Sequence, residues 1–79
     1  MIRELETVVL TRDVPEHGLV RGDVGAVVHC YADGEAFEVE FVTAEGNTVA
    51  VLTLAAPDVR RMGSGEILHV REVASGRAG

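Results

Sequence analysis

Four side chains of this sequence are of the types that bind transition metals or act as nucleophiles: His17, His29, Cys30 and His69. A structural zinc site needs three or four such ligands, usually with pairs two to four residues apart. His29 and Cys30 are adjacent in a strand-like run, so their side chains point to opposite faces, and only a tertiary meeting with His17 or His69 would build a site. A nucleophilic cysteine needs a pocket that stabilises its thiolate, and a strand of a small barrel offers no obvious cleft. We therefore expect no metal, no cofactor and no catalytic nucleophile, with Cys30 a small core residue.

Paired carboxylates, the usual groups for general acid–base catalysis, occur at Glu38 and Glu40 in the run FEVEF. Residues two apart in a strand share a face and lie about 7 Å apart, given a rise of roughly 3.3 Å per residue. Acid–base work at neutral pH needs one carboxyl whose pKa is raised by burial. The alternation of the run instead turns both glutamates toward water and Phe37, Val39 and Phe41 toward a core. We expect an interaction surface here rather than an enzyme, with further acids in the flanking turns: Asp33, Glu35 and Glu45.

Three glycines in the stretch EHGLVRGDVGAVVHCY, residues 16–31, raise the possibility of a phosphate-binding loop. Such a loop needs a lysine near its end and a helix after it. The sequence contains no lysine, and the glycines lead into a strand-like run. We therefore expect them to shape the chain: Gly18 ends a loop, Gly22 makes a turn with Asp23, and Gly25 permits a bulge or bend within the strand.

The charge of the chain is acidic, with 13 acids against 7 bases and a net charge of -6. All seven bases are arginines, and residues 32–58 contain none of them. An acidic surface repels nucleic acid, because affinity for it rests largely on neutralised phosphates. The alternative of RNA binding depends on the loops bringing four arginines into one basic spot. These are Arg12, Arg21, Arg60 and Arg61.

The elements that must position these residues are short strands. Residues 6–11, 24–31, 37–41 and 48–54 carry β-branched or alternating apolar residues, separated by turns such as Asp33-Gly34 and residues 44–47. Residues 56–62 are predicted to form one tight turn, with a short helical turn near 57–60 started by Pro57, and residues 66–73 a last strand. No segment has a helical apolar stripe. We predict a single all-β domain over residues 1–73, a small SH3-like barrel of five or six antiparallel strands, followed by a disordered tail at 74–79.

The strands carry more apolar residues than the inside of so small a barrel can hold. Neighbouring residues of a strand alternate between faces, so Val8, Val42, Ala50, Leu52 and Leu54 are not all expected to point inward. Some of this surface must be covered, by the last strand, by a second copy of the chain, or by another protein. Exposed strand edges can likewise be covered, by pairing with a strand of another chain.

A resemblance to known proteins rests on the motif L-T-x-D-x-P-E-x-G-L-x-x-G-D-x-G-x-V-V, matched from Leu10 to Val28, and on the FEVEF strand. Its glycine step resembles the KOW signature of ribosomal and transcription-elongation proteins. Taken from Leu5 to Met62, the chain resembles a bacterial family of small proteins classified as a domain of unknown function. This resemblance implies an SH3-like fold, a neighbouring gene that often encodes a toxin-like or effector protein, and no catalytic residues.

The resulting hypothesis is a non-enzymatic protein-binding module, either an antitoxin-like or immunity-like protein or an accessory subunit, acting on a partner encoded nearby. The alternatives are a KOW-like RNA-binding domain and a structural homo-oligomer, as a homodimer or a larger assembly. The expected contact residues are Pro15, Glu16, His17, Leu19, Arg21, Glu38 and Glu40. A cytoplasmic location is expected, since the N-terminus lacks the pattern of a signal peptide and no apolar run approaches the roughly 20 residues that cross a bilayer.

Overall fold

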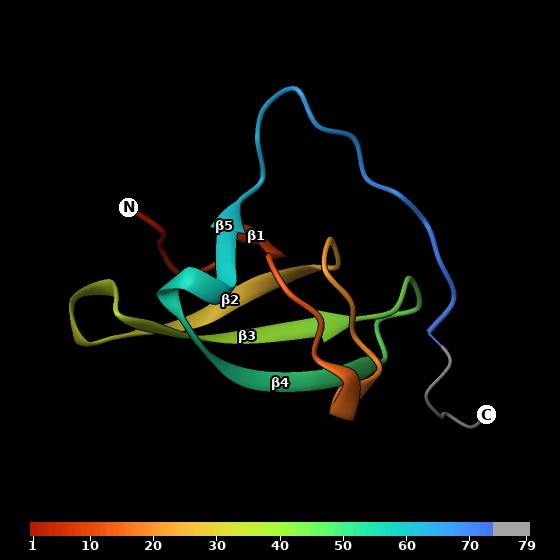
Figure 1. Ribbon diagram of the computed structural model, residues 1–79, viewed down its shortest axis with the longest axis horizontal. Helices are drawn as coiled ribbons and strands as arrows, with labels where there is room; N and C mark the ends of the chain where they lie inside the picture. The colour runs from red at the N-terminus through yellow and green to blue at the C-terminus, as the bar shows by residue number, and fades with distance from the viewer. Residues whose placement is uncertain (74–79) are drawn as a thin grey trace.

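Alternating apolar residues build one antiparallel sheet, which the computed structural model describes over residues 1–73 (Figure 1). Its five strands follow the order β4-β3-β2-β1-β5 across the sheet. Their bounds are β1 Thr7–Leu10, β2 Val24–Tyr31, β3 Ala36–Val42, β4 Thr48–Ala55 and β5 Val59–Arg61. Three short 3-10 turns join them: η1 Pro15–His17, η2 Ala32–Gly34 and η3 Ala56–Asp58. The predicted all-β fold is confirmed, and the predicted tail at 74–79 lies outside the described residues.

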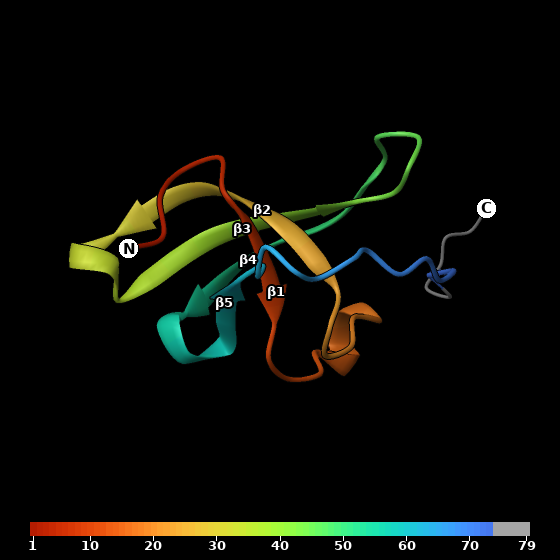
Figure 2. The same cartoon turned by 90° about the horizontal axis from the view of Figure 1, so that it is seen from above.

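The sheet curls strongly, so that its concave face wraps around the core (Figures 1 and 2). Its strand order, the long loop between β1 and β2, and the 3-10 turn before β5 are those of an SH3-like barrel. β4 and β5 form the two edges of the sheet and are not paired with each other. Within the described part of the chain, no helix is long and apolar enough to cross a membrane.

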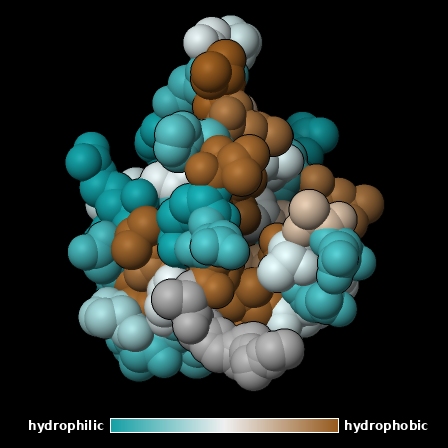
Figure 3. Space-filling view, turned by 90° about the vertical axis from the view of Figure 1, so that its right-hand side faces the viewer, coloured by the Kyte–Doolittle hydropathy of each residue, from teal (hydrophilic) through white to brown (hydrophobic). Residues whose placement is uncertain are grey.

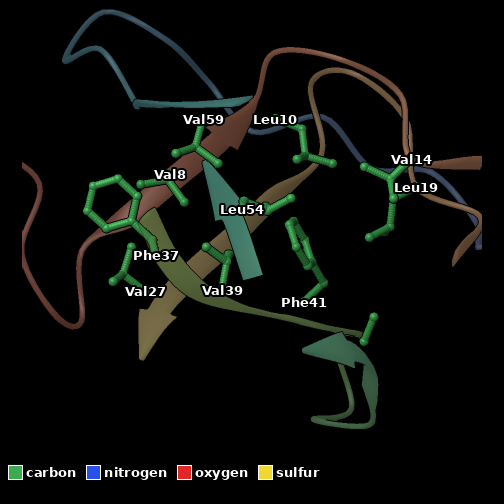
Figure 4. Close-up of a cluster of buried hydrophobic side chains, with 11 residues drawn as sticks. Val8, Leu10, Val14, Leu19, Val27, Phe37, Val39, Phe41, Leu54 and Val59 are labelled. Carbon is green, nitrogen blue, oxygen red and sulfur yellow. The ribbon is translucent and has the colours of Figure 1, made fainter. Parts of the chain in front are cut away.

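The core is built from one face of each strand (Figure 4). In β3 the pattern FEVEF buries Phe37, Val39 and Phe41 and turns Glu38 and Glu40 to the outer face, as predicted. β4 buries Ala50 and Leu54 and leaves Val51 and Thr53 outside. The other members of the buried cluster are Val8, Leu10, Val14, Leu19, Val27 and Val59.

The two hairpin turns contain residues that tolerate a left-handed backbone. Between β2 and β3, Asp33 and Gly34 have φ of 60° and 84°, the positive values that a tight hairpin turn requires. Between β3 and β4, Gly46 has φ of 88°. Both turns lie where the sequence predicts them.

The long loop between β1 and β2 folds back over one end of the core. Val14 and Leu19 are 3% exposed and form an isolated bridge, so the loop is anchored by two buried side chains. Gly18 ends η1 with φ of 70°, and Gly22 follows with φ of 96°. Both glycines shape the loop as predicted.

The bulge that the sequence allows at Gly25 does not form. It pairs regularly with Val8 of β1, and the register shift between β2 and β3 lies between Val27 and His29. A Cβ atom at Gly25 would lie 2.7 Å from Cγ1 of Val39 and 2.9 Å from Cε2 of Phe41. The residue must therefore be glycine because β3 side chains pack directly over its backbone.

The C-terminal part of the fold corrects two predictions. Residues 56–62 form η3 and then the short strand β5, which pairs with β1, rather than one turn. The predicted strand at Glu66–Val73 is wrong, because residues 62–73 form no strand. The edge of β1 that does not pair with β2 pairs with β5 instead. Val59 of β5 packs into the core. The segment 62–73, named the arch, leaves β5 and curves around the side of the barrel (Figure 1).

Candidate protein-binding groove

The arch is fastened to the barrel at both ends by ion pairs. At its start, the guanidinium of Arg60 in β5 donates to both carboxylate oxygens of Glu66, at 2.9 and 2.8 Å. Near its end, Nε of Arg71 donates to Oδ1 of Asp23 at 2.8 Å, and its Nη2 donates to the carbonyl oxygen of Gly18 at 3.0 Å. The two fasteners join the arch to β5 and to the loop that precedes β2.

The carboxylates of these fasteners are held in their charged form. The Arg60 guanidinium and the Gly63 N–H lower the pKa of Glu66 to about 2. Burial would raise the pKa of Asp23, but hydrogen bonds from Arg71 and from the Val20 N–H outweigh it and lower that pKa. Both ion pairs are therefore intact at neutral pH.

A groove of about 680 Å³ lies between the arch and the sheet. Its walls come from the start of β2, the hairpin between β3 and β4, and the arch. Most of its surface is apolar, and hydrophobic residues gather on this side of the molecule (Figure 3). The principal apolar residues that line it are Val24, Ala26, Val42, Val49, Leu68 and Val70.

The apolar side chains of the arch are not covered by the barrel. Ile67, Leu68 and Val70 are 89%, 64% and 91% exposed. On the opposite wall, Val42 is 51% exposed. The groove is thus framed on two sides by apolar side chains that still face water.

The acidic residues of β3 are tied to their neighbours on the outer face of the sheet. Oε1 of Glu38 accepts hydrogen bonds from the Thr53 hydroxyl at 2.7 Å and from the Tyr31 hydroxyl at 3.2 Å. Oε2 of Glu40 accepts from the Thr48 hydroxyl at 2.8 Å. The bond to Glu38 raises the pKa of Tyr31. Both glutamates are half-buried rather than fully solvated, and Glu40 also lines the groove.

The predicted contact residues of the β1–β2 loop are only partly available. Pro15, Glu16 and His17 form η1 and are exposed. Leu19 is 3% exposed and anchors the loop in the core, and it also lies along the wall of the groove. Arg21 is exposed, and its backbone N–H donates to Oδ1 of Asp13 at 2.8 Å.

Three of the four arginines considered for RNA binding are paired with carboxylates. Arg12 lies 3.0 Å from Asp58, in addition to the pair that Arg60 makes with Glu66. Arg61 lies 3.4 Å from Glu6. A guanidinium beside a carboxylate has much of its charge compensated, so these three do not form a free basic spot.

The residues considered for metal binding or nucleophilic chemistry lie apart. Across residues 1–73, no three His, Cys, Asp or Glu side chains come together as metal ligands would. His29 is exposed beside Glu4, at 3.5 Å, and stacks edge-on against Tyr31. Cys30 is partly buried, and its thiol points to the carbonyl oxygen of Ile2 at 3.7 Å.

Sequence reasoning missed the residues that frame the groove: Leu68, Val70 and Arg71. The apolar spacing of their run, EILHVREV, predicts a strand that does not form. Ile67 and Leu68 are adjacent, which breaks a strict alternation. That interruption was the available signal, whereas the contact between Arg71 and Asp23 spans 48 positions and has no local signature.

Comparison with known proteins supports the suspected family. No curated protein and no solved structure matches the chain significantly. The sequence model of a family described as Domain of unknown function (DUF4926) matches residues 4–61. The match contains all five strands and stops at the last residue of β5, so the arch lies beyond it. The chain belongs to this family of domains of unknown function, DUF4926.

Proposed function

We propose that this protein is a non-enzymatic binding module that captures an extended apolar segment of another protein between the arch and the sheet. The observation that carries the proposal is the exposure of Leu68 and Val70, which line the groove on a segment that is fastened at both ends. When a partner covers apolar side chains that face water, the free energy of the complex falls by roughly 25 cal/mol per Å² buried. The groove offers that partner a place.

The fasteners favour binding by fixing the arch in advance. A free C-terminal segment would lose conformational entropy when it closed over a ligand, and that loss weakens binding. Arg71 holds the arch through two acceptors, Asp23 and the Gly18 carbonyl. A partner segment therefore meets a wall that is already in place.

The charge of the chain indicates the chemistry of the partner. Residues 32–58 contain no base, Glu40 lines the groove, and Glu38 lies two residues away on the same face. A partner whose apolar segment is flanked by lysine or arginine complements this surface, and opposite charges mainly increase the rate of association and its specificity. We propose a basic protein with an exposed, extended apolar segment.

The family resemblance supports a more specific role. It implies a gene that is often encoded beside toxin-like or effector genes, which is consistent with an antitoxin-like or immunity-like protein or with an accessory subunit. The proposed mode of action is inhibition by occupying the partner's surface. The proposed location is the cytoplasm, where the thiol of Cys30 would stay reduced.

Affinity purification of the tagged full chain from its own host, followed by mass spectrometry, tests the proposal. One stoichiometric basic protein is expected, and Leu68→Glu and Val42→Glu should each abolish its recovery. Val28→Glu is the matched control, because Val28 is 40% exposed but does not line the groove. Unchanged recovery with both groove variants would overturn the groove as the site.

The same experiment addresses the RNA alternative. If RNA or ribosomal protein is recovered and its recovery falls steeply with added salt, the function would be RNA binding. Its contact residues would then be Arg12, Arg21, Arg60 and Arg61. The carboxylates beside three of these arginines do not favour that outcome.

A further inference from the structure

The two edges of the sheet are protected to different degrees. β5 has three residues, two of them arginines, and follows Pro57 and Asp58. Short length, charge and proline are the usual devices that keep an edge strand from pairing with another chain. β4 has eight residues, TVAVLTLA, and none is charged or proline. Of the two edges, β4 is the one that lacks this protection.

The backbone groups at the β4 edge can be assigned from the ladder. The Ala56 N–H donates to the Glu35 carbonyl at 3.0 Å. In an antiparallel ladder, paired residues alternate between bonding the neighbour strand and pointing away from it. Leu54 and Leu52 therefore bond β3, whereas Val51, Thr53 and Ala55 direct their N–H and C=O groups away from it.

This part of the edge is regular and uncharged. Residues 50–55 pair with β3 without a register shift, and across residues 1–73 β4 pairs with no other strand. Val51 is 47% exposed on the outer face, and Leu52 is only half-buried on the core face. The edge of β4 therefore presents unpaired N–H and C=O groups beside apolar side chains that are only partly covered.

We propose that β4 is a homodimer interface, at which a second copy of the chain adds its own β4 antiparallel across a two-fold axis at Thr53. In this register Val51 lies opposite Ala55 of the second copy, and Ala55 lies opposite its Val51. Each of the three outward-directed residues then uses both its N–H and its C=O. The two sheets become one continuous sheet.

The absence of charged residues on β4 makes this edge compatible with a second copy of an acidic chain. The chain has a net charge of -6, so most of its surface repels an identical molecule. The β4 edge is free of that repulsion because it contains no charged residue. Glu38 and Glu40 are on the next strand and accept hydrogen bonds from Thr53 and Thr48. The strand also opposes small or β-branched residues to one another, which suits cross-strand pairing.

Sedimentation velocity on the full chain tests the proposal directly. The wild type is expected to change from monomer to dimer with rising concentration, and Val51→Pro should raise the dimer dissociation constant by about tenfold or more, since hydrogen bonds are lost at two symmetric positions. Val51→Ala is the control, because it keeps the N–H. A monomer at all concentrations, or a dimer equally stable in the proline variant, would overturn the proposal.

Crosslinking provides a second measurement that does not depend on the folding of the proline variant. In a Cys30→Ser background, Thr53→Cys should be crosslinked to dimer by a short bismaleimide, because the two residues 53 face each other at the axis. Val28→Cys should not, since Val28 is exposed on the interior strand β2. Equal crosslinking of both variants, or none in Thr53→Cys, contradicts the proposed register. If the chain is monomeric and Val51→Pro still prevents recovery of a basic partner, the edge belongs to that partner instead.

Discussion

Nε of Arg71 lies 2.8 Å from Oδ1 of Asp23, although 48 positions separate the two residues in the chain. This ion pair and the bond from Arg71 to the Gly18 carbonyl hold the far end of the arch against the β1–β2 loop. The loop is itself anchored in the core by Val14 and Leu19. A loop that is anchored in the core by two side chains thereby determines where an exposed segment lies.

Replacing Arg71 with alanine should release the arch without unfolding the barrel. The side chains of Arg71 and Asp23 are 31% and 16% exposed, and partly exposed pairs contribute about 1 kcal/mol or less to stability. We expect nearly unchanged thermal unfolding but a marked fall in the heteronuclear NOE of residues 66–73. Arg71→Lys should give an intermediate result, because lysine cannot serve both acceptors in the same geometry. Equal NOE values in wild type and Arg71→Ala would show that the arch is held by other contacts.

The pair between Arg60 and Glu66 should give the arch a strongly acidic transition. The pKa of Glu66 is lowered from 4.5 to about 2. A carboxyl whose folded pKa is depressed stabilises the structure above its unfolded pKa and loses that effect as the pH falls through the folded value. The contribution should therefore be complete above about pH 4.5 and decline toward pH 2. A carbon-detected NMR titration of Glu66 is expected to show this midpoint, and in Arg60→Ala the midpoint should move back toward 4.5.

Gly25→Ala should destabilise the barrel by about 1–3 kcal/mol, the range for overpacking a filled core. The added Cβ would lie 2.7 Å from Cγ1 of Val39 and 3.0 Å from the carbonyl oxygen of Glu40, and the carbonyl cannot turn away without breaking the sheet. Gly65→Ala is the control, because a Cβ added there would meet no atom within 4 Å, and its effect should stay within about 0.5 kcal/mol. Urea unfolding of both variants measures the difference, and equal midpoints would contradict the tight packing at Gly25.

Comparing Leu10→Ala with Leu68→Ala should separate the effect of a core residue on stability from the effect of a groove residue on partner binding. Leu10 is 1% exposed and Leu68 is 64% exposed. Truncation of a buried leucine costs about 2–5 kcal/mol, a large share of the stability of so small a domain. Leu68→Ala should leave the unfolding midpoint unchanged and weaken partner binding. A large loss of stability in Leu68→Ala would mean that the arch supports the barrel.

Much of the fold follows from residue patterns of short range. β2 has the predicted bounds, and the ends of β3 and β4 differ from their predictions by no more than one residue, because alternation and β-branched runs depend on nearby residues alone. β5 escaped notice because a three-residue strand with one buried side chain, Val59, has no period to detect.

The candidate site was harder to predict because its parts meet only in three dimensions. The exposed acids and the loop residues 15–17 are identifiable from the sequence, but the burial of Leu19 depends on the loop folding over the core. The apolar run at 66–73 is visible in the sequence but predicts the wrong structure, because the segment is held by the side chains of Glu66 and Arg71 and does not pair with an edge of the sheet. The place of Arg71 depends on the folded position of Asp23.

The arch has one further consequence, for how specificity could diversify. Among the described residues, the buried core takes no member from positions 62–73. Substitutions at Ile67, Leu68 and Val70 are therefore uncoupled from the packing that holds the barrel together, as long as Glu66 and Arg71 keep the fasteners. Under the proposed function, gene duplication or a randomised library at Leu68 and Val70, which line the groove, would yield barrels of the same architecture that discriminate among different ligands.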